Sequence, residues 1–207
     1  MRITSGKLRS RILVSPKDKH THPMGDREKL ALFNSLDLSM KGLNVLDLYA
    51  GSGALGLETI SRGSHAVTFV EKSPKAIKAI KENAELLDVS KRTRIFPISV
   101  QEFLARSLGK PSNSISPKNR QSAKDDPHPH NPHPQIDKFE KYDLILIDPP
   151  YDDFRVEQFA AAEDLLAPDG FLVLSHPGLI APVGIFERLN LITTRKYASA
   201  HISIYQK

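Results

Sequence analysis

An apolar run followed by a glycine-rich turn and a helical pattern constrains this chain more than any other segment. The run extends from Leu43 to Leu48, contains Asp47, and leads into the turn and helix start at 49–56. Strand, glycine turn and helix in this order form a nucleotide-binding βα unit, because glycines let a ligand approach the backbone and the helix N-terminus presents free N–H groups. Asp47 would repel a pyrophosphate and attract an ammonium group. We therefore predict an adenosine-containing ligand with a positive end, held by Asp47, Tyr49, Ala50, Gly51, Ser52, Gly53 and Gly56.

A second buried strand is predicted at Ala66–Val70, directly before Glu71 and Lys72. An acid that ends the second strand, about 20 residues after the glycine turn, is placed to bind a ribose diol. Glu71 alone is equally compatible with a solvated charge at a strand end. Its spacing from Gly53 favours the ribose contact.

The tetrapeptide Asp148-Pro149-Pro150-Tyr151 follows the apolar run Leu144–Ile147. Two prolines remove two backbone donors and keep the chain extended, so the strand ends there. The Asp148 carboxylate and the Pro149 carbonyl can each accept a hydrogen bond from one of the two N–H groups of a planar amine, while the Tyr151 ring covers the face of that group. Proline pairs also punctuate ordinary surface turns, and this reading remains open for the tetrapeptide taken alone.

The remaining pattern alternates between strands and helices, which predicts an α/β fold with a parallel sheet. Helices are expected from Ser73 or Pro74 to Leu87, over Val100–Leu108 and over Val156–Leu166, and strands over Arg94–Ile98 and Gly170–Leu174. The last two runs, Leu191–Tyr197 and His201–Tyr205, lie too close together for a crossover helix and should pair as an antiparallel hairpin.

Composition narrows the classes of function. The 207 residues suffice for one compact domain. The absence of Cys excludes disulfide scaffolds, thiolate metal sites and Cys nucleophiles. No apolar run reaches membrane length and the N-terminus lacks the core of a signal peptide, so we expect a cytoplasmic protein. The net charge of +5 favours a polyanionic partner.

Residues 1–41 form a locally basic arm ahead of the domain expected at 42–207. A short hairpin is expected around Gly6, followed by a helix with Asp26 as N-cap and Leu30, Phe33 and Leu36 facing inward. A solvated basic face is the plainer interpretation of the arm. Together with the tetrapeptide at 148–151, phosphate binding is favoured, with the candidates Arg2, Lys7, Arg9, Arg11 and Arg27.

The segment 109–138 is rich in Pro, Ser, Asn, Lys and Asp and has little to bury. We expect a disordered insertion near the substrate entrance. His128, His130 and His133 have a spacing that could bind a metal, but a proline-rich loop gives them no supporting shell, and we expect no metal site.

The whole motif set resembles the RsmD family, bacterial 16S ribosomal RNA guanine-N2 methyltransferases that use S-adenosylmethionine. The similarity runs over essentially the whole chain outside the insertion. The motifs that carry it are Arg2-Ile3-Thr4-Ser5-Gly6-Lys7 with Arg9 and Arg11, Pro23-Met24-Gly25-Asp26-Arg27 leading to Leu32-Phe33-Asn34, Leu46 to Glu58, and Asp148-Pro149-Pro150-Tyr151. The resemblance implies a Rossmann-like class I methyltransferase fold, a seven-stranded, mostly parallel sheet with a reversed last strand. It also implies a partner in the 30S subunit or an assembly intermediate, and nothing in the sequence predicts an obligate oligomer.

The chain departs from this family at two places. His22-Pro23-Met24-Gly25 replaces an Arg-Pro-Thr-Thr stretch, and Ser99-Val100 stands where many relatives have an acidic or amide residue for the adenine amino group. A hydroxyl or backbone contact at Ser99 or Val100 would have to substitute.

Two other functions remain open from the residues. The amine clamp, formed by Asp148, Pro149 and Tyr151, would serve adenine N6 in DNA or RNA, or a protein amide, as well as guanine N2. A nicotinamide oxidoreductase could use the same glycine turn, although it leaves Asp47 and the tetrapeptide at 148–151 unexplained.

Overall fold

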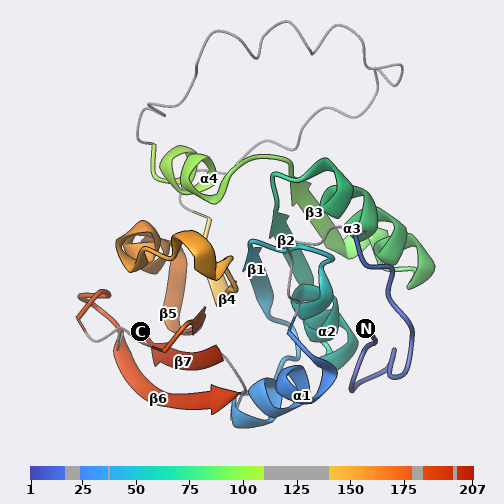
Figure 1. The fold of residues 1–207 in the computed structure, drawn as a ribbon, viewed down its shortest axis with the longest axis horizontal. Helices are drawn as coiled ribbons and strands as arrows, with labels where there is room; N and C mark the ends of the chain where they lie inside the picture. The colour runs from blue at the N-terminus through green and yellow to red at the C-terminus, as the bar shows by residue number, and fades with distance from the viewer. Residues whose placement is uncertain (17–23, 37, 110–139, 179–183, 198–199) are drawn as a thin grey trace, which may run out of the picture.

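A computed structural model describes residues 1–16, 24–36, 38–109, 140–178, 184–197 and 200–207 of the chain. Its centre is one twisted seven-stranded sheet (Figure 1) in the order β3-β2-β1-β4-β5-β7-β6. The strands are β1 (Asn44–Leu48), β2 (Ala66–Val70), β3 (Thr93–Phe96), β4 (Tyr142–Ile147), β5 (Leu166–His176), β6 (Asn190–Tyr197) and β7 (Ala200–Gln206).

The strands β3, β2, β1, β4 and β5 are mutually parallel, and β7 runs antiparallel to both of its neighbours, β5 and β6. This arrangement confirms the expected Rossmann-like sheet with a reversed last strand. It also confirms the antiparallel pairing of the last two runs. The strand order changes direction between β1 and β4. Ligands of open α/β sheets bind at the carboxyl ends of the strands at such a switch point.

Helices cover both faces of the sheet. One face packs against α1 (Asp26–Ser35), α2 (Ala54–Arg62) and α3 (Pro74–Leu86), and the other against α4 (Val100–Ser107) and the 3-10 helix η5 (Val156–Leu165). Two short 3-10 turns, η1 (Ser90–Arg92) and η4 (Tyr151–Asp153), complete the described helices. Strand residues alternate between the two cores, as the period of two requires. Among the described helices, none combines the length and apolar character needed to span a membrane.

Two expected elements differ from the structure. The segment after the tetrapeptide is a 3-10 helix rather than an α-helix. In α1 the N-cap is Gly25 instead of Asp26, and Leu30 is 40% exposed although we expected it to face inward. The inward positions are Lys29, Leu32, Phe33 and Leu36 because Lys29 is buried beside an acid of α2, which rotates Leu30 toward solvent.

The basic arm is tied to α2 by side chains rather than by an extended sheet. Its hairpin has a single antiparallel bridge, Arg2 to Ile12. Glu58 of α2 accepts hydrogen bonds from the backbone N–H groups of Thr4 and Ser5, at 2.8 and 2.9 Å. Lys29 lies 3.7 Å from the same carboxylate, and both side chains are fully buried. The insertion expected at 109–138, with its three histidines, lies outside the described residues apart from Gly109.

Candidate active site

The carboxyl ends of β1 and β4 bring two acids to one place. In the parallel register Asp47 lies opposite Leu146, and Leu48 lies opposite Ile147. Asp148 follows one residue later and, by alternation, points to the same face of the sheet as Asp47. The structure therefore joins the predicted cofactor acid and the predicted amine acceptor, which are about 100 residues apart in sequence.

Asp47 is buried beneath the start of α2. Its Oδ2 accepts the Gly56 N–H at 2.9 Å, and only 1% of the residue is exposed. Burial raises the pKa of Asp47, and the charges of Asp148 and Glu71 act in the same direction. The hydrogen bond from Gly56 lowers the pKa, and the net value is about 8. A carboxylate in this position is stabilised by a cation, so the site favours a positively charged ligand.

The glycine turn has the backbone shape that its sequence requires. Gly51 and Gly53 have φ of 56° and 77°, and Tyr49 shares this left-handed region with φ of 61°. A Cβ on Gly51 would have only the Tyr49 carbonyl oxygen near it, at 4.0 Å, so this part of the turn is open for a ligand. A Cβ on Gly56 would lie 2.4 Å from the Phe69 ring. Gly56 therefore lets α2 pack closely against β2.

Tyr49 holds its strained backbone at the rim of the site. Its hydroxyl accepts a hydrogen bond from Gln101 at 2.9 Å, and its ring meets Phe159 edge-on at 5.9 Å. Non-glycine residues in left-handed conformations cluster at functional sites. This is consistent with the predicted contact of Tyr49 with a cofactor.

Glu71 links the end of β2 to the glycine turn. One carboxylate oxygen accepts the Gly51 N–H at 2.9 Å and the other accepts the Ser73 N–H at 2.8 Å. Both oxygens keep lone pairs for a diol, and the neighbouring Lys72 is exposed. At the end of β3, the Ser99 hydroxyl caps α4 by accepting the Glu102 N–H, and the Val100 side chain is buried.

Asp148 is partly accessible. The surrounding protein nevertheless desolvates it and raises its pKa to about 6, while a hydrogen bond from Ser175 lowers the pKa and the charge of Glu28 raises it. Pro149 is buried and Pro150 exposed. The hydroxyl of half-buried Tyr151 lies 2.6 Å from the Ser175 hydroxyl.

Ser175 and Glu28 were not among the residues selected from the sequence. Ser175 is the penultimate residue of β5, after its apolar run, and Glu28 lies in the first turn of α1, where its side chain accepts the Gly25 N–H at 2.7 Å. Neither position carries a sequence motif typical of a functional site. Only the neighbouring position of β5 and the packing of α1 bring them to Asp148.

Of the five predicted nucleic-acid contacts, Arg2 forms an ion pair with Asp26, with Arg2 Nε 3.2 Å from Asp26 Oδ2. The other four residues, Lys7, Arg9, Arg11 and Arg27, are exposed. The backbone N–H of Lys7 donates to the carbonyl of Ser61 in the last turn of α2, so the hairpin tip lies at the end of α2 opposite to the glycine turn. The structure does not bring the tip residues to the Asp148 site.

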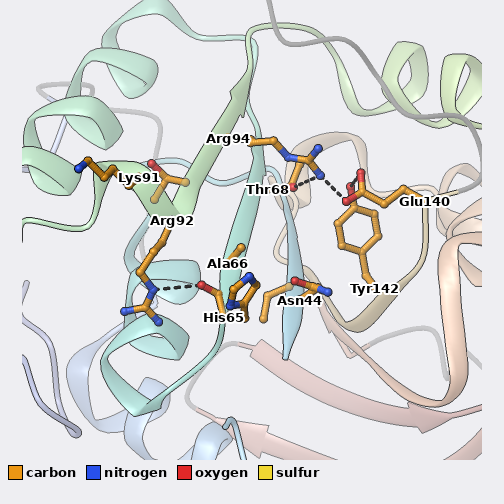
Figure 2. A pocket seen from close by; sticks show the side chains of 11 residues that line it. Asn44, His65, Ala66, Thr68, Lys91, Arg92, Arg94, Glu140 and Tyr142 are labelled. Carbon is orange, nitrogen blue, oxygen red and sulfur yellow. Dashed lines mark hydrogen bonds and ion pairs between the residues drawn. The ribbon is translucent and has the colours of Figure 1, made fainter. Parts of the chain in front are cut away.

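A cavity of about 240 Å³ opens at the other, amino edge of the sheet. In Figure 2 the Arg94 side chain points toward Thr68 and Glu140, which it contacts, Arg92 donates to the His65 carbonyl, and Lys91 extends away from them. Both guanidinium groups thus have partners already. The cavity lies away from the carboxyl-edge residues and takes no part in the site described above.

In the part of the chain that the structure describes, no cluster of three His, Asp or Glu side chains could hold a metal ion.

The family model described as Conserved hypothetical protein 95 matches residues 1–116. Over the full chain, the sequence is 28% identical to the Bacillus subtilis protein named "Putative rRNA methyltransferase YlbH", covering 100% of this chain and 99% of that protein. It is 33% identical to "Ribosomal RNA small subunit methyltransferase D" of Escherichia coli over 56% of this chain and 57% of that protein.

Solved structures agree on the fold. The Escherichia coli protein titled "Putative methyltransferase yhhF" superposes with a TM-score of 0.74 at 22% identity, covering 100% of this chain and 97% of the other. The class I methyltransferase fold, the arrangement of the carboxyl-edge residues and the match over residues 1–116 agree. The chain therefore belongs to the family described as Conserved hypothetical protein 95, the RsmD family.

Proposed function

We propose that this protein transfers a methyl group from S-adenosylmethionine to the exocyclic N2 amine of a guanine in 16S ribosomal RNA. The observation that carries the proposal is the position of Asp47 and Asp148 at adjacent strand ends on one face of the sheet. One acid suits the cationic end of the donor, and the other suits the amine that receives the methyl group. The names of the relatives support ribosomal RNA as the substrate class.

The residues of the first site fit S-adenosylmethionine. Buried Asp47 favours a positive charge, the open side of Gly51 leaves room for a ligand, and Glu71 stands where a ribose would bind. When bound, S-adenosylmethionine supplies an electrophilic methyl group on a positively charged sulfur. The protein contributes position and charge rather than covalent chemistry.

The residues Asp148, Pro149 and Tyr151 activate the guanine amine, which is a poor nucleophile. The lone pair of the guanine amine is conjugated with the ring, so the nitrogen must become pyramidal before it reacts. The Asp148 carboxylate and the Pro149 carbonyl each accept a hydrogen bond from one N–H of the amine and favour the pyramidal nitrogen, whose lone pair is no longer conjugated with the ring, while Tyr151 stacks on a base swung out of its helix. Asp148 then accepts the proton that the methylated nitrogen releases.

Methyl transfer from labelled S-adenosylmethionine tests the proposal. The substrates are 30S particles, protein-free 16S rRNA and duplex DNA, and the modified nucleoside is identified by mass spectrometry. We expect N2-methylguanine in 16S rRNA. Label in N6-methyladenine or in DNA would overturn the guanine assignment, and calorimetric binding of NAD without binding of S-adenosylmethionine would overturn the methyltransferase assignment.

A further inference from the structure

The Ser175 hydroxyl lies between the two side chains assigned to the methyl acceptor. It is 2.6 Å from the Tyr151 hydroxyl and also hydrogen-bonds to the Asp148 carboxyl group. Ser175 is 2% exposed, so water does not compete for these bonds. It comes from β5, which pairs with β4 in register, with Leu174 opposite Ile147.

We propose that Ser175 is a positioning residue that fixes the Asp148 carboxylate and the Tyr151 ring relative to each other. This inference rests on the proposed function. A serine hydroxyl has one proton and two lone pairs, so it can donate a hydrogen bond to the Asp148 carboxylate while it accepts a hydrogen bond from the Tyr151 hydroxyl. The chain of bonds therefore has one consistent direction, from Tyr151 through Ser175 to Asp148.

This arrangement solves a geometric problem of the site. Tyr151 lies in the short turn η4 after two prolines, where local hydrogen bonds hold a side chain only weakly. Attachment of its hydroxyl to a buried group on a central strand orients the ring that covers the base. The same group turns one carboxylate oxygen of Asp148, and the other oxygen stays free for the amine.

The charged groups around Asp148 allow a second readout. Glu28 of α1 and Asp47 of β1 face it with like charge, and the Ser175 hydrogen bond opposes their effect by favouring the ionised carboxylate. Loss of the hydroxyl therefore raises the pKa of Asp148. An activity that needs this carboxylate ionised then reaches its maximum only at higher pH.

The test compares Ser175→Ala with Ser175→Thr and with Ser203→Ala. Ser203 is also a buried serine, in β7, but its hydroxyl contacts His176 and Thr194 instead of the clamp. We expect Ser175→Ala to lower kcat roughly 10- to 100-fold. It should leave the Kd of S-adenosylmethionine unchanged and shift the acid limb of the kcat profile to higher pH. Ser175→Thr should restore most of the rate, and Ser203→Ala should retain it.

A double-mutant cycle with Tyr151→Phe adds an independent measure, because groups joined by one hydrogen bond give non-additive effects. Additive losses, or an unmoved acid limb in a folded Ser175→Ala protein, would overturn the positioning role while the wild-type activity stands. Absence of methyl transfer by the wild type itself would instead reject the proposed function. Circular dichroism and the Kd of S-adenosylmethionine report whether each variant is folded.

Discussion

The charged residues at the two edges of the parallel sheet differ in whether a partner balances their charge. At the amino edge Arg94 is matched with Glu140 and Arg92 with backbone carbonyls. At the carboxyl edge Asp47 and Asp148 are desolvated beside each other, and burial raises the pKa of both. Charges with a partner stabilise a fold. Like charges that are buried together at a cost in free energy indicate a functional site. A cavity is therefore a weaker guide to function here than unfavourable electrostatics.

Removal of the clamp acid tests the carboxyl edge most directly. Asp148→Ala removes the acceptor of the amine proton, and we expect kcat to fall by about 10² to 10⁴. The Kd of S-adenosylmethionine, measured by calorimetry, should stay within a few-fold of the wild-type value because Asp148 does not hold the donor. A rate close to wild type would contradict the assigned role.

The arm carries the next largest effect. Glu58→Ala removes the buried carboxylate beside Lys29, which keeps only the Arg2 carbonyl at 2.5 Å and Asp26 at 3.8 Å, and it removes the acceptor of two arm N–H groups. We expect a loss of about 3 to 5 kcal/mol in the free energy of unfolding, measured with urea. A matched exposed control is Glu82→Ala, whose pair with Lys78 lies on the surface of α3. Its effect should be below about 1 kcal/mol.

Asp47 should affect both the affinity for S-adenosylmethionine and the stability of the free protein. Asp47→Asn removes the charge that attracts the donor, and we expect affinity for S-adenosylmethionine to fall roughly 10- to 100-fold. The same change should stabilise the free protein. Because the folded pKa of about 8 lies above the usual value of 3.8, wild-type stability falls as pH rises between these values. The Tm advantage of the variant should thus be absent near pH 4 and largest above pH 8. An equal advantage at both pH values would contradict the charge explanation.

The pKa of Asp148 sets the pH dependence of the reaction. With a value of about 6, the carboxylate is largely protonated at pH 5 and ionised at pH 8. We expect kcat, measured with saturating substrates, to rise through pH 6 and level off. An activity independent of pH between 5 and 7 would indicate that an ionised Asp148 is not required.

The amino edge should respond least. Arg94→Ala breaks a pair whose side chains are 37% and 30% exposed, so we expect a change of at most about 1 kcal/mol in stability. Methyl transfer should remain within about two-fold of wild type. A large loss of activity would show that the two edges are coupled.

Much of the fold and part of the site could be predicted from the sequence. The run 43–48 with its glycine turn, the alternation of strands and helices, and the acids Asp47, Glu71 and Asp148 are local patterns, set by the period of side chains and the freedom of glycine. The error at Leu30 has a different origin. There tertiary contacts, such as the burial of Lys29 against Glu58, override local preference.

The sequence by itself determined the class of sheet, the glycine turn after β1 and the acids at the strand ends, because each depends on residues close together in the chain. Only the tertiary structure decided that Asp47 and Asp148 share one face, that Ser175 and Glu28 approach the clamp, and that the tip of the basic hairpin lies at the far end of α2. These facts depend on strand order, register and helix rotation, which long-range packing fixes and no short motif encodes.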